Sequence, residues 1–146
     1  LRESFDYVIG SIHSRFSMDR ETMTARIMSA MDDPTLTILA HPTGRLLLER
    51  EGYEVDLDAI IDKAAASGVT IELNADPARL DLDWRWCRVA RDRGVRIEIG
   101  PDAHSPRGLD HTWFGVSLAR KAWLSADDVL NTRSATDIVK IARSRR

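Results

Sequence analysis

The chain has 146 residues, of which 43% are hydrophobic and 30% are charged, and its formal net charge is −2. These values fit one globular domain with a real core, and they exclude a disordered or fibrous protein and the strongly basic surface of a dedicated duplex-binding domain. No apolar run approaches the roughly 18 residues of a membrane span, so we expect a cytoplasmic protein that does not contact a membrane.

Strand-like and helix-like segments alternate along the chain. Short apolar runs predict strands, and longer segments with apolar residues every three or four positions predict helices. In chain order, the expected segments are a strand at 5–12, a helix at 19–31, a strand at 36–40, a helix at 56–67, a strand at 69–74, a helix at 83–93, a strand at 95–99 and helices at 110–123, 125–130 and 135–143. Parallel neighbours need crossovers of this length, so the alternation predicts an α/β fold of parallel βα units.

Local signals predict several helix ends. Asp56 is a good N-cap, and Gly68 stands where a left-handed residue ends a helix. Ser125 with Asp128 three residues later resembles a capping box, which predicts a short helix there. The single cysteine, Cys87, lies inside an expected helix, so we interpret it as a small packed residue rather than a ligand or a nucleophile.

Three of the four histidines stand at or just past the carboxyl end of an expected strand. They are His13, His41 and His104, and Asp102 shares the loop of the last one. Because the carboxyl ends of parallel strands meet at one edge, imidazoles and a carboxylate in these places predict a shared metal site. The alternative for each histidine is a structural role in the core. His111 lies within an expected helix, so we interpret it as a packing or surface residue.

Two further residues near these strand ends are candidates for contacts with substrate. Asn74 ends its strand at the level of the histidines and could orient a ligand, although an asparagine there also suits a turn. Arg45 follows His41 and Pro42 in a turn-rich loop, where its planar guanidinium suits a pair of phosphate oxygens or is simply an exposed charge. Because proline restricts the residue before it, we expect an extended backbone at His41.

Side-chain alternation assigns faces to two of the strands. In 69–74 the polar face carries Thr70, Glu72 and Asn74. In 95–104 it carries Arg96 and Glu98, and the same parity brings Asp102 and His104 onto this side. Charges on an inward face are costly unless they are paired. We therefore predict that Arg96 forms an ion pair with Glu72 or Glu98 beneath the site. No glycine-rich phosphate loop, nucleophile elbow or CxxC pair occurs, so metal-assisted hydrolysis suits the residues best.

Four sequence blocks resemble the C-terminal half of a PHP (polymerase and histidinol phosphatase) domain. They are V-I-G-S-I-H-S at 8–14, I-L-A-H-P at 38–42, I-E-L-N at 71–74 and P-D-A-H-S at 101–105. Within that superfamily, H-P-T-G-R at 41–45, R-L-D-L-D-W at 79–84 and the segment 113–131 are most similar to the bacterial family X DNA polymerase, in which the PHP domain follows the polymerase domain.

The resemblance implies a distorted, TIM-like (β/α)7 barrel whose strand tips hold up to three manganese or zinc ions. It also implies phosphoester hydrolysis, which in the polymerase is a 3′-5′ exonuclease activity that processes DNA ends in repair. The residues that match the family's metal ligands are His13, His41, Asp102 and His104. Arg45 and Asn74 match positions near the site.

The chain departs from the family pattern at its start. The opening His-x-His motif and the Asp, His and Glu that follow it have no counterpart, and Gly100-Pro101 replaces an expected polar pair. We therefore expect residues 1–146 to be the C-terminal part of a single PHP domain, a fragment of a longer chain with a polymerase domain upstream. A partial barrel exposes strand edges and an apolar interior, which predicts self-association.

The expected substrate is a DNA 3′ end. The first alternative is a phosphorylated small molecule, cleaved by a stand-alone phosphatase that acts on a compound such as histidinol phosphate. The second alternative is a non-catalytic structural module with an incomplete metal site.

Overall fold

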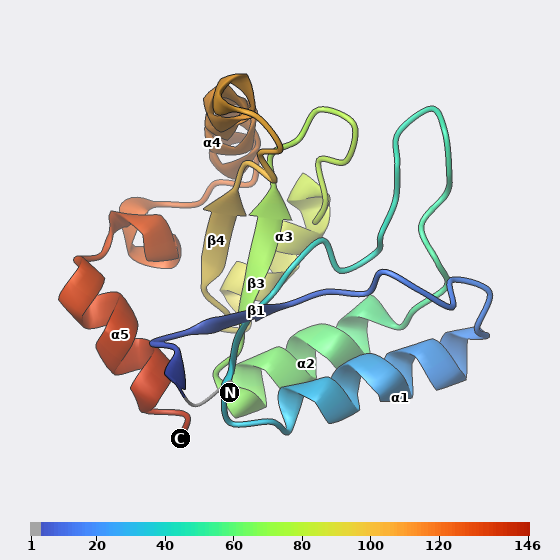
Figure 1. Cartoon of the computed structure of the whole chain (residues 1–146), viewed down its shortest axis with the longest axis horizontal. Coiled ribbons are helices and arrows are strands. Elements are labelled where there is room, and N and C mark those ends of the chain that lie inside the picture. Colours follow the sequence, from blue (N-terminus) through green and yellow to red (C-terminus); the bar gives the residue numbers. More distant parts are fainter. Residues whose placement is uncertain (1–3) are drawn as a thin grey trace.

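Four parallel strands form one sheet in the computed structural model, which describes residues 4–146. In chain order and in space they are β1 (Val8–Gly10), β2 (Leu36–Leu39), β3 (Thr70–Asn74) and β4 (Ile97–Gly100). Each neighbouring pair is parallel. The sequence prediction of an α/β fold with parallel βα units is therefore confirmed (Figure 1).

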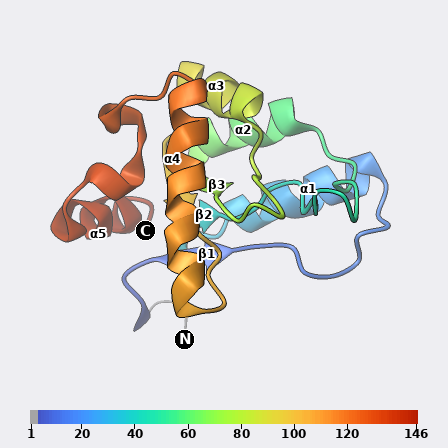
Figure 2. The ribbon, with the colours of Figure 1, turned by 90° about the horizontal axis from the view of Figure 1, so that it is seen from above.

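The helices fall between and after the strands. They are α1 (Arg20–Met31), α2 (Leu57–Ser67), α3 (Trp84–Asp92), α4 (Thr112–Lys121) and α5 (Ala135–Arg143), with 3-10 turns η2 (Pro106–His111), η3 (Ala126–Asp128) and η4 (Leu130–Thr132). Figure 2 shows α1, α2 and α3 on one side of the sheet and α5 on the other. In Figure 1, α4 lies beside the arrowheads of β3 and β4, which are the carboxyl ends of those strands. Within residues 4–146, every helix is too short or too polar to span a lipid bilayer.

The predicted helix caps are present. The Asp56 side chain accepts a hydrogen bond from the Ala59 N–H, and Gly68 ends α2 with a φ of 72°. Ser125 and Asp128 form the predicted capping box. The segment after that box is not the expected short helix. Val129 is extended and forms a parallel bridge to Ile97, so pairing with the edge of the sheet divides 125–130 into 3-10 turns.

The first strand is shorter than the sequence predicted. β1 has three residues rather than the expected eight, and its pairing with β2 shifts register between Val8 and Ile9. Ile9 is 51% exposed at this edge, where no further strand of residues 4–146 pairs with it. The apolar pattern at 5–12 is therefore longer than the segment that pairs with β2, which is Val8–Gly10.

The two faces of the sheet follow the predicted alternation. Leu39, Ile71 and Ile97 stand in register and belong to the buried hydrophobic core under the helices. Glu72 and Glu98 stand opposite each other on the other face. This register confirms that polar side chains of neighbouring strands gather on one side of the sheet.

The C-terminal residues close the molecule on the side away from the strand tips. The Arg145 guanidinium donates to the carbonyls of Ser67 and Met31, the last residues of α2 and α1, at 2.8 and 3.0 Å. It also donates to the Asp33 carbonyl at 3.5 Å. A cation at helix carboxyl ends satisfies carbonyls that lack partners within the helix. This side chain therefore ties two helices to the end of the chain.

Candidate metal centre

The four predicted metal ligands line one cavity at the carboxyl edge of the sheet. His13 follows β1, His41 follows β2, and Asp102 and His104 follow β4. All four side chains line a cavity of about 400 Å³, whose wall also includes Glu72 and other residues of the strand ends. The structure thus brings together side chains that are up to 91 positions apart in the sequence, and their role as ligands stays a prediction.

His13 and His41 are direct neighbours, with ring centroids 5.2 Å apart in an edge-to-face arrangement. His41 is 5% exposed, and its Nδ1 has no hydrogen-bond partner. Burial, assisted by the positive charge of Arg79, lowers the pKa of His41 below its usual value. The neutral imidazole therefore predominates at neutral pH, and this is the form that binds a metal ion.

Side chains from two directions hold the backbone of the His41 loop. Glu72 Oε2 accepts the His41 N–H at 2.7 Å, and Asp81 Oδ2 accepts the N–H groups of Thr43 and Gly44 at 3.0 and 2.9 Å. The expected extended backbone at His41 was wrong, because its φ is 31°. Positive φ is costly for a residue with a side chain, and here these hydrogen bonds stabilise it.

Asp102 is held by charge and by hydrogen bonds. Its φ is 50°, and its Oδ2 lies 3.0 Å from Nε of Arg79 in an ion pair with side-chain exposures of 24% and 18%. Burial alone would raise the pKa of Asp102, but a hydrogen bond from Asn74 and the charge of Arg79 outweigh it and lower the pKa. Asp102 is therefore an anion at neutral pH.

His104 contacts its own loop. Its Nδ1 lies 2.7 Å from the carbonyl oxygen of Asp102. Because a carbonyl only accepts, we infer that Nδ1 carries the proton and that Nε2 holds the lone pair. Metal-binding histidines commonly use this arrangement, since it fixes both the tautomer and the ring.

Glu72 and Glu98 also line the cavity, and the ion pair with Arg96 that the sequence predicted for one of them does not form. Burial raises the pKa of Glu72 to about 8. The negative charge of Glu98 also raises this pKa, whereas the hydrogen bond from the His41 N–H lowers it. Within residues 4–146, no ion pair joins Arg96 to either carboxylate; Arg96 donates to the Gly68 carbonyl at 3.3 Å instead. The Arg96 prediction was wrong because this side chain precedes β4 and turns toward the opposite end of the sheet.

The two predicted substrate-contacting residues differ in position. Asn74 is fully buried between acidic groups: its Nδ2 lies 3.3 Å from Glu72 Oε2, and it stabilises the ionised form of Asp102. Arg45 does not line the cavity, and its guanidinium donates to the carbonyls of Arg79, at 2.8 Å, and Leu80. No local pattern in the sequence marks Arg79 as a site residue, although it lies in the loop after β3, the kind of position that carries function.

The imidazole and carboxylate groups at the site are of the right chemical type to bind a divalent metal ion, but too few of them are placed around one point. Imidazole and carboxylate suit manganese and zinc, and the buried Nδ1 of His41 has no hydrogen-bond partner. However, residues 4–146 contain no group of three or more His, Cys, Asp or Glu side chains placed to hold one ion. The described part of the chain therefore supplies pairs of donors rather than a complete coordination shell.

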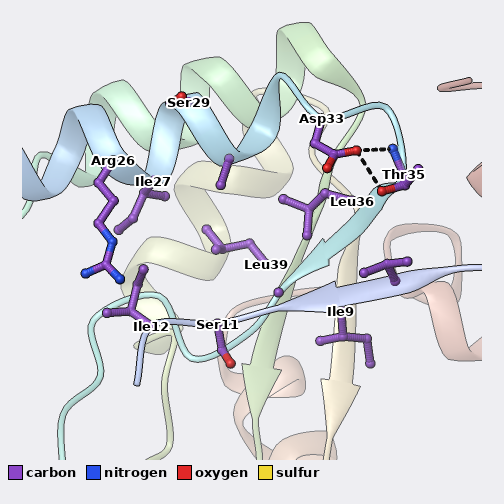
Figure 3. A pocket seen from close by; sticks show the side chains of 13 residues that line it. Ile9, Ser11, Ile12, Arg26, Ile27, Ser29, Asp33, Thr35, Leu36 and Leu39 are labelled. Carbon is purple, nitrogen blue, oxygen red and sulfur yellow. Dashed lines mark hydrogen bonds between the residues drawn. The ribbon is translucent and has the colours of Figure 1, made fainter. Parts of the chain in front are cut away.

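A larger cavity lies on the helix side of β1 and contains none of the predicted ligands. It measures about 590 Å³ and is lined by residues of β1, α1 and β2 and of the segments beside them (Figure 3). Ile12, Ile27 and Leu39 give it apolar walls. At one end, Asp33 Oδ1 accepts from the N–H and hydroxyl of Thr35, at 2.9 and 2.6 Å. No histidine is among its lining residues, so the metal chemistry is expected in the smaller cavity.

Known proteins similar to the chain agree with the motif analysis, although no protein-family model matches. The chain is 43% identical over 133 residues to the DNA polymerase/3′-5′ exonuclease PolX of Bacillus subtilis, an alignment that covers 91% of the chain and 23% of that protein. The resemblance to a family X DNA polymerase is confirmed. The chain thus spans about a quarter of the length of PolX.

Weaker matches are to proteins named as probable phosphatases. The chain is 27% identical over 113 residues to a probable phosphatase of Clostridium acetobutylicum, covering 71% of the chain and 43% of that protein. It is 26% identical over 139 residues to a probable phosphatase of a Thermoanaerobacter species, covering 89% and 54%. The chain spans about half the length of these two relatives.

Proposed function

We propose that the chain forms part of a metal-dependent phosphoesterase site, as the C-terminal part of the PHP domain of a family X DNA polymerase. The observation that carries this proposal is the convergence of His13, His41, Asp102 and His104 on one cavity. The similarity to PolX, which is named as a polymerase and 3′-5′ exonuclease, supports DNA 3′ ends as the substrate and DNA repair as the setting. A polymerase domain upstream in the same polypeptide is part of this proposal.

The order of the strands supports a (β/α)7 barrel for the complete domain. Doubly wound sheets reverse their strand order at a switch point, whereas the order β1-β2-β3-β4 runs without reversal as a barrel requires. The face that carries Glu72 and Glu98 would then line the barrel, and the helices beside α1 would form its outer ring. Ile9, exposed at the edge of β1, would pack against a further strand or, in the isolated chain, against a second copy.

The chain's own side chains would hold manganese or zinc at this edge. His41 presents a neutral imidazole, His104 presents Nε2, and Asp102 presents a carboxylate that already has Arg79 on one oxygen. When bound, the metal ions would supply an activated water for attack on phosphorus and neutralise the charge that develops there. Asn74 would hold Asp102 in place and therefore act without touching the substrate.

Two guanidinium groups are candidates for contact with the substrate phosphate. Arg45 would first have to leave the carbonyls to which it donates. Arg79 needs no such move, because it already stands beside Asp102. A planar guanidinium in either position suits two phosphate oxygens.

Two other functions have support from specific observations. A phosphatase for small phosphorylated molecules is supported by the probable phosphatases, of which the chain covers a larger share than it does of PolX. A non-catalytic module is supported by the absence of a three-residue metal group within residues 4–146.

The test is hydrolysis by the full-length protein that contains this chain. With Mn²⁺ present, we expect it to shorten a 5′-labelled single-stranded oligonucleotide from its 3′ end, and we expect Asp102→Asn to lower that rate by at least a hundredfold. Preferential cleavage of p-nitrophenyl phosphate or histidinol phosphate would support the phosphatase instead. Equal rates for the wild-type protein and the variant would exclude a catalytic role for this site.

A further inference from the structure

Glu72 is on β3, between the strands that lead into two of the three ligand-bearing loops, those after β2 and β4. Its Oε2 accepts the His41 N–H at 2.7 Å and lies 3.3 Å from Nδ2 of Asn74, the last residue of β3. The Glu72 side chain is 6% exposed, so the surrounding protein fixes its position. One carboxyl group thereby connects the backbone of His41 to the end of β3.

The backbone of β4 leaves room for this carboxylate. Gly100 is opposite Asn74 in the sheet, and a Cβ on Gly100 would lie 2.3 Å from Oε1 of Glu72. That distance is far below van der Waals contact, so any larger residue must displace the carboxylate. Gly100 stands where a polar residue was expected, and its lack of a side chain leaves the space that Glu72 occupies.

The His41 N–H donates its hydrogen bond to Glu72 at a residue whose backbone conformation is strained. The residue has a φ of 31°, and the acceptor of its N–H is a side chain rather than a neighbouring strand. Without that acceptor, a buried N–H would be unsatisfied, and the loop would relax toward a more common conformation. The imidazole would then lose its fixed place next to His13.

We propose that Glu72, seated against Gly100, is a positioning residue that fixes the His41 loop and so sets the affinity of the site for divalent cations. The effect on cations rests on the proposed function, whereas the hold on the His41 loop does not. Residues that orient metal ligands typically change metal affinity 10- to 100-fold when they are replaced. Glu72 acts through its acceptor oxygen, so a glutamine that keeps this oxygen should replace it.

Amide hydrogen exchange at His41, measured without metal, tests the hold on the loop. We expect Glu72→Ala and Gly100→Ala to accelerate exchange of this amide at least tenfold, and Glu72→Gln to leave it within threefold of the wild-type rate. Glu98→Ala is the matched control, because Glu98 lies in the same cavity but bonds to Asn131 rather than to the loops. Gly100→Ala displaces the carboxylate without removing it, which keeps the test open if Glu72→Ala does not fold.

A Co²⁺ titration followed by visible absorption tests the effect on the site. We expect Glu72→Ala and Gly100→Ala to weaken Co²⁺ binding at least tenfold, and Glu72→Gln to restore it. Unchanged exchange at His41 in both alanine variants would overturn the inference, as would a Glu72→Gln variant that behaves like Glu72→Ala. Failure of the wild-type chain to bind Co²⁺ would instead count against the proposed function, and the exchange rates would still decide the role of Glu72 in the loop.

Discussion

A double-mutant cycle on Arg79 and Asp102 measures how strongly the site is held before any metal binds. The two charged groups lie 3.0 Å apart with side-chain exposures of 18% and 24%. Exposed ion pairs contribute about 0.2–1 kcal/mol, and breaking a fully buried pair costs about 3–5 kcal/mol. This pair lies between those limits, so we expect a coupling energy of about 1–2 kcal/mol between Arg79→Met and Asp102→Asn.

The assay is urea denaturation of the wild-type chain, the two single variants and the double variant, with EDTA present. The control cycle uses Arg143 and Asp6, whose groups are 3.1 Å apart but 65% and 60% exposed. We expect a coupling below about 0.5 kcal/mol for that pair. Equal coupling in the two cycles, or effects that are additive within about 0.3 kcal/mol for Arg79 and Asp102, would refute the reasoning.

The coupling should also depend on pH in a defined direction. The folded state lowers the pKa of Asp102, so the stability that its carboxylate contributes is complete above the unfolded pKa of about 3.9. That stability is lost as the pH falls through the lower folded pKa. A coupling that is constant from about pH 5 to 8 and disappears in stronger acid is therefore expected. Loss of the coupling as the pH rises through neutrality would contradict this assignment.

Other predictions concern the fold around the site. Arg145→Ala removes a cation from the carbonyls that end α1 and α2. We expect the free energy of unfolding to fall by about 2 kcal/mol and the melting temperature to fall by about 4–8 °C. A loss of stability no larger than that of Arg143→Ala would contradict this. Burial raises the pKa of the Cys87 thiol to about 12, so a disulfide reagent at pH 8 should react with it only as the protein unfolds. Rapid reaction with the native chain would show that α3 does not pack as described. Gly68→Ala places a Cβ on a residue with a φ of 72°, which should cost about 1 kcal/mol in urea denaturation, and no loss would exclude the left-handed end of α2.

Features decided by neighbouring residues could be predicted from the sequence. The cap at Asp56 and the left-handed end at Gly68 follow from side chains and backbone within one turn. The alternation of apolar and polar residues likewise predicted that Glu72 and Glu98 share a face, which their register confirms. The shared cavity of the histidines follows from the same rule, since every parallel strand brings its carboxyl end to one edge.

Features decided by distant loops could not be predicted. Arg45 and Arg79 are both arginines in loops near strand ends, and only the tertiary packing places the first on carbonyl groups and the second on Asp102. The expected conformation of His41 was wrong because Pro42 restricts it only weakly compared with the hydrogen bond that the His41 N–H donates to Glu72. Val129 leaves its expected helix for a bridge to the sheet, which no local pattern indicates.

Titration of the chain with Co²⁺ tests the central claim most directly when each histidine is replaced in turn. The account predicts that alanine at His13, His41 or His104 weakens binding at least tenfold. His111, which does not line the cavity, is the matched control and should bind Co²⁺ like the wild-type chain. Four variants that bind with the wild-type affinity, or a loss confined to His111→Ala, would contradict a metal site at these strand ends.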